Sequence, residues 1–206
     1  MTPTAEQLEA IRCPDPVVVL LAAAGGGKTA TLIERIAWLI EQGHTTEDLL
    51  VLTFTNRSAL EMRERLAVRL GLDEPPRDMW VSTFHSAGLR ILRTFGDRLN
   101  YDPARLTVIT PDEADMVLRR ACSRLGKLRN GKWTGGVTWL GVSGYRENFY
   151  TGSEQEDDGD LALCFNEYRQ MLRAYHVIDF GMILADTTRL FEEHPDVLEV
   201  YQGRFK

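Results

Sequence analysis

A run of small residues that ends in lysine and threonine is the part of the sequence best suited to chemistry. The run is AAAGGGKT, residues 22–29, and it lies between an apolar segment and an amphipathic one. Successive backbone N–H groups in such a loop, with the partial positive charge of the following helix end, favour bound phosphate. Lys28 would reach the β- and γ-phosphates of ATP, and the Thr29 hydroxyl would coordinate Mg²⁺, so these are the expected catalytic side chains. The rest of the expected ATP-binding loop is Ala22, Ala23, Ala24, Gly25, Gly26 and Gly27.

Ala22 occupies a position where this loop usually has glycine. The first position needs only a small side chain that clears the backbone turn, so alanine is acceptable there. Gly25 and Gly27 lie where a positive φ or a close approach of phosphate is expected, and those conditions favour glycine.

Two further stretches place polar and aromatic side chains directly after expected strands. LTFTNRSALEMRERL, residues 52–66, offers an aromatic face for a nucleic-acid base and polar groups for its backbone. STFHS, residues 82–86, offers hydroxyl and imidazole groups at a helix start, where phosphate can bind. The candidate DNA-binding residues are Thr53, Phe54, Thr55, Asn56, Thr83, Phe84, His85 and Ser86. Two structural alternatives remain open: Phe54 as a core residue beside a helix cap at Asn56, and His85 as a structural histidine.

Strands and helices are expected to alternate through the first half of the chain, which predicts an α/β fold with a parallel sheet covered by helices. Ligands of such sheets bind at the carboxyl ends of the strands, where all three motifs lie. The expected strands are residues 17–24, 48–55 and 79–83, and the expected helices are residues 5–11, 28–42, 57–70 after a cap at Asn56, and 84–95.

The alternation changes after residue 98. A short strand is expected in residues 106–110, followed by a capping box from Thr110 to Glu113 and a helix to about Leu125. Residues 127–160 are expected to form a loop with one broken helix around TWLGVSGYRENFY, and the acidic run EQEDDGD is expected to be solvated. Two helices should follow, over residues 161–176 and 180–194.

Composition limits the functional classes. The net charge of −6 argues against a protein that coats nucleic acid by bulk attraction, although it allows a local basic groove. The three cysteines are widely spaced and form no C-x-x-C pair, which fits a reducing compartment. Residues 17–24 form the longest apolar run and are too short to span a bilayer, so we expect a cytoplasmic protein without a membrane anchor.

Taken together, the motifs resemble the N-terminal part of UvrD/Rep/PcrA-type superfamily 1 DNA helicases, and the likeness covers nearly the whole chain. TAEQLEAI is similar to the family's Q motif, in which Gln7 would read adenine. AAAGGGKT is similar to its phosphate loop, which commonly begins with alanine, and residues 52–66 and 82–86 are similar to motifs Ia and Ib, which contact single-stranded DNA. Residues 177–206 resemble the segment that returns the chain to the core.

The resemblance implies a RecA-like P-loop NTPase core with a mostly helical inserted subdomain. The core would comprise residues 1–108 and 178–206, and the insertion residues 109–177. Its implied cofactors are ATP and Mg²⁺, and its implied activity is ATP-dependent 3'-5' movement on single-stranded DNA in repair or replication.

Two departures from the family pattern stand out. Ala30 replaces a basic residue that often follows the lysine-threonine pair, and the family's D-F-D-D-L reads Asp179-Phe180-Gly181-Met182-Ile183.

ATP hydrolysis also needs carboxylates that hold Mg²⁺ and position water, which the family takes from a D-E-x-x-D strand. No substitute is convincing, since Asp73 and Glu74 follow a helix and Asp179 is better explained as a helix cap. We therefore expect a fragment that hydrolyses ATP poorly and whose partner is the rest of the helicase or a full-length helicase. The alternatives are the motor of a recombination helicase-nuclease and a non-catalytic helicase-like binding module; a generic P-loop kinase is disfavoured.

Overall fold

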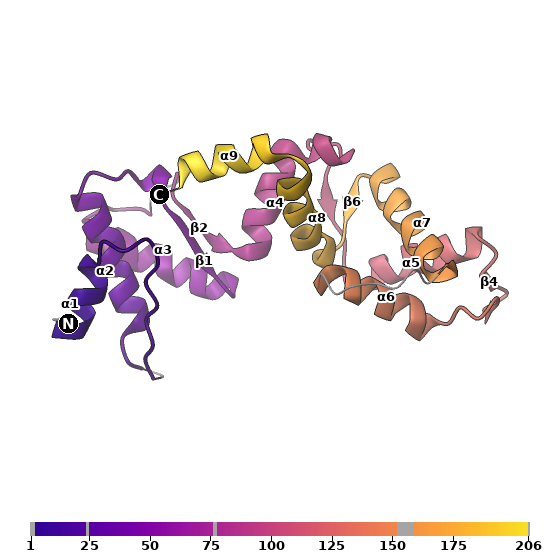
Figure 1. Ribbon diagram of the computed structural model, residues 1–206, viewed down its shortest axis with the longest axis horizontal. Coiled ribbons are helices and arrows are strands. Elements are labelled where there is room, and N and C mark those ends of the chain that lie inside the picture. Colours follow the sequence, from indigo (N-terminus) through magenta and orange to yellow (C-terminus); the bar gives the residue numbers. More distant parts are fainter. Residues whose placement is uncertain (1–2, 24, 76–77, 152–158, 206) are drawn as a thin grey trace. The chain divides into compact units, whose positions relative to one another are not determined.

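The computed structural model of the chain describes residues 3–23, 25–75, 78–151 and 159–205. The chain divides into two compact units, one of residues 1–84 and 200–206 and the other of residues 85–199. The fold is mixed α/β, mostly helical with small parallel sheets, and Figure 1 labels its elements.

A two-stranded parallel sheet forms the centre of the first unit. β1 (Leu50–Thr53) and β2 (Trp80–Thr83) pair in register, so that Thr53 lies opposite Thr83 at their carboxyl ends. The connecting helix α3 (Asn56–Leu70) covers the sheet, and Arg63 of this helix donates a hydrogen bond to the carbonyl of Val81 at 2.8 Å. The buried apolar core comprises Ile33, Ile36, Leu49, Val51, Met62, Leu66, Met79 and Val81. The expected parallel β-α-β arrangement of these two strands is confirmed.

The expected first strand, residues 17–24, is wrong for the part that the structure describes. Residues 17–23 form no strand. Leu21 is 89% exposed, and Val17 and Val19 are also largely exposed. A cavity of about 540 Å³ lies beside this segment, lined among others by Val18 and Leu20. A strand is stable only when its N–H and C=O groups find a neighbour, and β1 and β2 pair only with each other among the described residues. Ala24 lies outside the described residues.

Two helices hold the phosphate-loop region together. α1 (Ala5–Arg12) begins with the expected capping box between Thr4 and Gln7, and α2 (Lys28–Glu41) follows the loop. Arg35 of α2 donates hydrogen bonds to the carbonyls of Ala10, Ile11 and Cys13, at 2.8, 3.2 and 3.1 Å. These carbonyls at the end of α1 have no partner within their own helix. The guanidinium group therefore binds α1 to α2.

The C-terminal residues also pack within the first unit. The ring of Trp80 lies edge-on to Tyr201 and Phe205, with centroid separations of 5.8 and 5.4 Å. Arg204 lies over the Trp80 ring and donates a hydrogen bond to the carbonyl of Glu47 at 3.1 Å. These contacts attach the end of α9 (Pro195–Arg204) beside β2.

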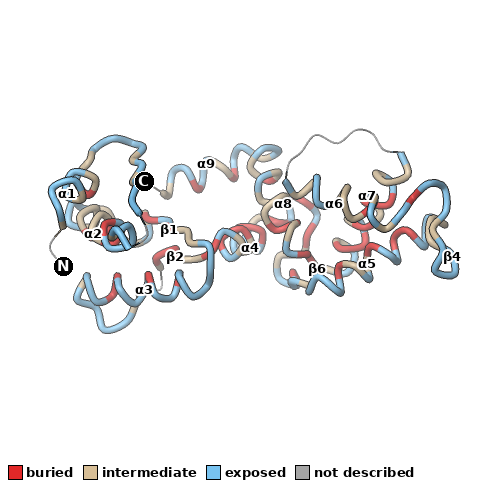
Figure 2. The backbone as a smooth tube through the Cα atoms, turned by 90° about the horizontal axis from the view of Figure 1, so that it is seen from below, coloured by how far each residue is buried: buried red, intermediate tan, exposed pale blue. Residues whose placement is uncertain are grey.

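The second unit is built from helices around a short parallel pair of strands. β3 (Thr107–Val108) pairs with β6 (Val177–Ile178), and a hairpin joins β4 (Leu128–Arg129) to β5 (Lys132–Trp133). Its helices are α4 (Phe84–Phe95), whose first residue belongs to the first unit, α5 (Pro111–Arg124), α6 (Trp139–Thr151), α7 (Asp160–Ala174) and α8 (Phe180–Glu193). The red stretches of α5, α7 and β6 in Figure 2 mark the buried residues of this unit. Short 3₁₀ helices occupy Thr46–Asp48 in the first unit and Gly96–Leu99 in the second.

The structure of residues 127–206 differs from the expected one in three ways. The helix expected to be broken is continuous as α6, and the hairpin of β4 and β5 was not expected. Its turn uses Asn130 and Gly131, both at positive φ, which is the preferred chemistry of a two-residue hairpin turn. α9 was not expected as a helix either, because the proline after His194 ends α8 and at the same time begins the next helix. Residues 152–158, which hold most of the acidic run, lie outside the described residues.

Candidate nucleotide and DNA site

The phosphate loop has the backbone geometry that its glycines predict. Gly25 and Gly27 have φ of 78° and 79°, in the left-handed region that favours glycine. Gly27 is the N-cap of α2, and Lys28 and Thr29 are the first two helical residues. The N–H groups at the start of a helix have no partner within it, and the helix dipole places positive charge there. The positive φ at Gly25 and Gly27 and the helix start at Lys28 are therefore as expected, and phosphate binding at this loop stays a prediction.

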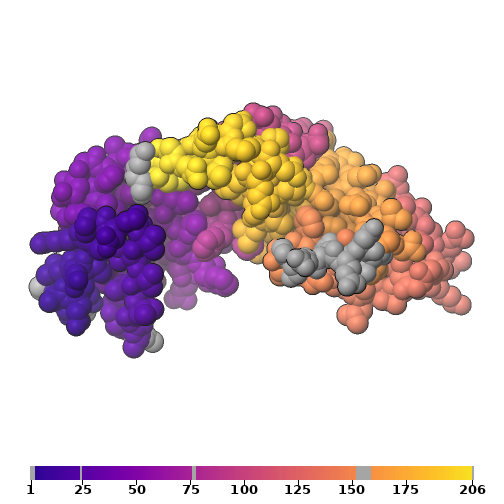
Figure 3. Space-filling model, viewed as in Figure 1, coloured from indigo at the N-terminus to yellow at the C-terminus, as the bar shows by residue number. Residues whose placement is uncertain are grey.

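Lys28 is folded back onto its own loop. Its ammonium group donates hydrogen bonds to the carbonyls of Ala22 and Ala23, at 2.6 and 2.8 Å. The residue is exposed, and so are Ala22 and Ala23. Phosphate oxygens could replace the two carbonyls without any burial of charge, because the ammonium group is already at the surface. Figure 3 shows the surface of the N-terminal part of the chain, in indigo.

Gln7 lies against the phosphate loop, 19 residues away in sequence. Its side-chain carbonyl accepts the N–H of Thr4 at 3.0 Å, and its amide donates to the carbonyl of Gly26 at 3.3 Å. The capping box of α1 thus fixes the rotamer with which Gln7 reaches the loop. Gln7 and Gly27 also line a cavity of about 180 Å³, together with Pro3, Ala30, Thr31, Ile33, Glu34 and Arg65.

Arg65 was not identified from the sequence. It lines the same cavity as Ala30, where the family pattern often has a basic residue, and it pairs with Glu61 on its own helix. Nothing in the local sequence around Arg65 shows that this arginine, among several on its helix, reaches the cavity beside Gly27.

The described residues of the loop fit ATP, and Thr29 is the expected protein ligand of a magnesium ion there. Thr29 is exposed in the first turn of α2, beside Lys28. No group of three histidine, cysteine, aspartate or glutamate side chains in the described chain is arranged to hold a metal ion. Mg²⁺ commonly takes few protein ligands and completes its shell with phosphate oxygens and water. Thr29 is therefore compatible with a magnesium ion that arrives with the nucleotide.

The two acidic sites considered as substitutes have other places in the fold. Asp73 and Glu74 lie in the loop after α3, as expected. Asp179 is 4% exposed and caps α8 by accepting the N–H of Met182 at 2.8 Å, which confirms its expected role as a helix cap.

A substitution at Gly27 should weaken nucleotide binding. A Cβ at this position would lie 2.8 Å from the Gln7 amide nitrogen, and the backbone φ of 79° is strained for any other residue. Gly27→Ala should therefore displace Gln7 and reduce the affinity for MgATP by roughly tenfold, or about 1.4 kcal/mol, because the displaced amide can no longer meet the adenine. Isothermal titration calorimetry measures the change.

Gly43→Ala is the matched control. Gly43 has φ of 102° and nothing within 4 Å of an added Cβ. Alanine at this position therefore strains the backbone but displaces no neighbouring side chain. Equal loss of affinity in both variants would mean that strain alone, and not the position of Gln7, explains the effect.

The stretch after β1 exposes its aromatic residue. Phe54 is 93% exposed, so the core alternative for this residue is wrong. The hydroxyl of Thr53 donates to the carbonyl of Thr55 at 3.1 Å, and Thr55 caps α3 by accepting the N–H of Ser58 at 3.0 Å. Asn56 is the first helical residue and does not cap α3, because the preceding threonine has the extended backbone that a cap requires.

The stretch after β2 is placed next to the first by strand pairing. Because Thr53 lies opposite Thr83, Phe54 and Phe84 directly follow neighbouring strand ends. Phe84 is half exposed, whereas Thr83 is buried. His85 and Ser86 belong to the first turn of α4. The phosphate loop is not brought to this edge by strand pairing, because among the described residues no strand leads into it.

His85 has an aromatic partner that sequence reasoning missed. Its imidazole stacks on the ring of Phe180, with centroids 3.6 Å apart and 16° between the planes. Burial lowers the pKa of His85, which favours the neutral imidazole. The only signal for Phe180 was its place in the D-F-G-M-I stretch, which does not show that it meets His85.

The described helices include none that is long and apolar enough to cross a membrane.

Comparison with known proteins identifies the family of the chain. A family model described as the UvrD/REP helicase N-terminal domain matches residues 3–206. The chain is 29% identical over 208 residues to the ATP-dependent DNA helicase PcrA of Staphylococcus aureus, covering 98% of this chain and 28% of that relative. The PcrA of Staphylococcus epidermidis gives the same identity and coverage. The chain thus spans little more than a quarter of the length of these relatives. Because the family model covers nearly every residue, the chain belongs to the UvrD/REP helicase N-terminal domain family.

Proposed function

We propose that the chain is the ATP- and single-stranded-DNA-binding N-terminal part of an ATP-dependent DNA helicase that moves 3' to 5'. The observation that carries the proposal is the phosphate loop at the start of α2, with Gly25 and Gly27 in the left-handed region and Lys28 at the surface. Membership of the helicase family and the PcrA relatives support the DNA-directed activity. We also propose that the core is RecA-like, formed by residues 1–108 and 178–206, and that residues 109–177 are its insertion.

The nucleotide would be held by three kinds of contact. The backbone N–H groups at the start of α2 and the ammonium group of Lys28 bind phosphate, and the hydroxyl of Thr29 binds the magnesium ion. Gln7 would bind the adenine from the side of the loop that faces the 180 Å³ cavity. Magnesium neutralises phosphate charge when it is bound with the nucleotide.

Single-stranded DNA would bind along the carboxyl ends of β1 and β2. Phe54 offers an exposed ring on which a base can stack, and Asn56 offers an amide group for the DNA backbone. Thr53, Thr55, Thr83 and Phe84 complete the proposed surface of the first unit, and His85 and Ser86, the first residues of the second unit, are further proposed DNA contacts. The paired register of Thr53 and Thr83 supports one continuous strip of contacts after the two strands.

Phe54→Ala tests the DNA-binding part of the proposal. The variant should weaken the binding of a fluorescein-labelled oligo-dT strand by roughly tenfold, which is the order of one lost base stack. The free energy of unfolding should stay within about 0.5 kcal/mol of the unaltered chain, because a side chain that is 93% exposed contributes little packing. Fluorescence anisotropy and urea unfolding give the two values.

Val68→Ala is the control for this experiment. Val68 is an exposed apolar residue of α3 in the same unit, away from the strand ends. It should leave DNA affinity unchanged. The proposal fails if Phe54→Ala binds DNA as well as Val68→Ala does.

A further inference from the structure

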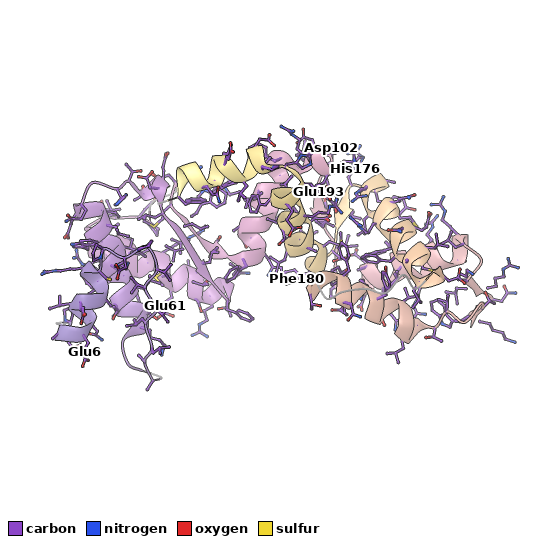
Figure 4. All side chains as sticks on the ribbon, in the orientation of Figure 1. Glu6, Glu61, Asp102, His176, Phe180 and Glu193 are labelled. Carbon is purple, nitrogen blue, oxygen red and sulfur yellow. The ribbon has the colours of Figure 1, made fainter. Side chains whose placement is uncertain are left out.

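The stack of His85 and Phe180 joins two helix starts within the second unit. His85 lies in the first turn of α4, and Phe180 is the first residue of α8; Figure 4 labels Phe180 at that end of the helix. The two planes are nearly parallel, at 16° and 3.6 Å. Phe180 remains 55% exposed, so its ring contributes less to the core than a buried phenylalanine would.

Phe180 is held by a rigid first turn of α8. The carboxylate of the preceding residue, Asp179, caps the helix at the N–H of Met182. It also accepts hydrogen bonds from the hydroxyls of Tyr150, at 2.5 Å, and Tyr168. Since Asp179 is buried and bonded to three groups, the backbone that carries Phe180 has little freedom.

Gly181 makes this arrangement possible. A Cβ at Gly181 would lie only 2.3 Å from the Tyr150 ring, so any other residue would force the ring away. The family's D-F-D-D-L has an acidic residue at this position. Its replacement by glycine lets the Tyr150 ring cover the first turn of α8 and bond to Asp179.

We infer that Phe180 is a positioning residue for His85, whose imidazole it holds in one plane so that the free ring edge donates to the backbone of single-stranded DNA. This inference rests on the proposed DNA-binding function. Burial favours the neutral imidazole, which has one N–H donor and one acceptor nitrogen. The contact is then a directional hydrogen bond and not an ion pair. Its loss should weaken binding without changing the salt dependence, which counts neutralised phosphates.

The test compares three replacements at the stack in the 206-residue chain. Phe180→Leu removes the flat ring and should weaken oligo-dT binding by roughly fivefold, because the imidazole must then be ordered when DNA binds. Phe180→Tyr keeps the ring and should stay within about twofold of the unaltered chain. His85→Ala combined with Phe180→Leu should bind no more weakly than His85→Ala alone, since coupled residues are not additive. The slope of log affinity against log salt should be the same in all variants.

Tyr175→Leu is the control, because Tyr175 is also a partly exposed aromatic residue of this unit. It should not change DNA affinity. Nuclear magnetic resonance reports on the stack without DNA: the ring protons of His85 should be shifted upfield in the unaltered chain and in Phe180→Tyr, and should move downfield in Phe180→Leu.

Several outcomes would overturn the inference. If the effects of Phe180→Leu and His85→Ala add, Phe180 contacts DNA itself and does not act through His85. Unshifted His85 ring protons in the unaltered chain would show that the stack does not persist in solution. This measurement needs no variant, so it tests the inference even if Phe180→Leu fails to fold. If the unaltered chain does not bind oligo-dT at all, the proposed DNA-binding function fails, and the inference fails with it.

Discussion

Lys28→Ala should weaken the binding of MgATP to this chain by roughly 100-fold, since a hydrogen bond from a charged group contributes about 1.5 to 3 kcal/mol and lysine reaches two phosphates. The ammonium group already lies at the loop, bonded to the carbonyls of Ala22 and Ala23. It needs only to exchange these two acceptors for phosphate oxygens. Isothermal titration calorimetry at fixed Mg²⁺ concentration measures the loss.

Two variants make the result specific. Lys132→Ala removes an exposed lysine of the β4 and β5 hairpin, so it has the same effect on net charge and should leave the affinity unchanged. Lys28→Arg retains the charge but replaces the compact ammonium group by a planar fork, and should restore only part of the affinity. The phosphate-loop assignment is wrong if Lys28→Ala binds MgATP within about threefold of Lys132→Ala, because that difference is under 1 kcal/mol.

Local signals predicted much of the fold. The capping boxes at Thr4 and Thr110 lie where the sequence places them, and α4 spans the residues expected for it. Gly71 ends α3 in the left-handed region, as a glycine after a helix predicts. These features depend on a few neighbouring residues, so one sequence contains the information that they need.

Features that depend on distant residues were less predictable. The apolar run 17–24 has the composition of a buried strand, yet composition does not supply the neighbouring strand that a sheet requires. The exposure of Phe54 was undecided for a similar reason, because the same side chain fits a core or a stacking surface.

In the candidate site too, features set by neighbouring residues were predictable and contacts between distant residues were not. Backbone geometry at Gly25 and Gly27 followed from residue type alone. The contact of Gln7 with Gly26 came only from the family resemblance, and the stack of His85 on Phe180 joins residues 95 positions apart that no local pattern connects. Tyr150 likewise reaches Asp179 across 29 residues.

Asp179→Ala should destabilise the second unit by roughly 3 to 5 kcal/mol, which is the largest stability effect we expect in this chain. The substitution removes the cap of α8 and leaves the hydroxyls of Tyr150 and Tyr168 without their acceptor. The buried hydroxyl of Tyr168 without a partner costs about 1 to 3 kcal/mol, the part-buried hydroxyl of Tyr150 costs less, and the lost cap costs about 1 kcal/mol. Hydrogen exchange of the α7 and α8 amides measures the opening free energy of this unit alone.

Asp179→Asn tests whether the hydrogen bonds of this side chain can form without its negative charge. The amide oxygen can still accept the N–H of Met182, and the tyrosine hydroxyls can rotate to accept from the amide nitrogen, so about half of the stability should return. Asp112→Ala, an exposed position in the first turn of α5, should cost no more than about 0.5 kcal/mol. A loss no greater than that of Asp112→Ala would contradict the network.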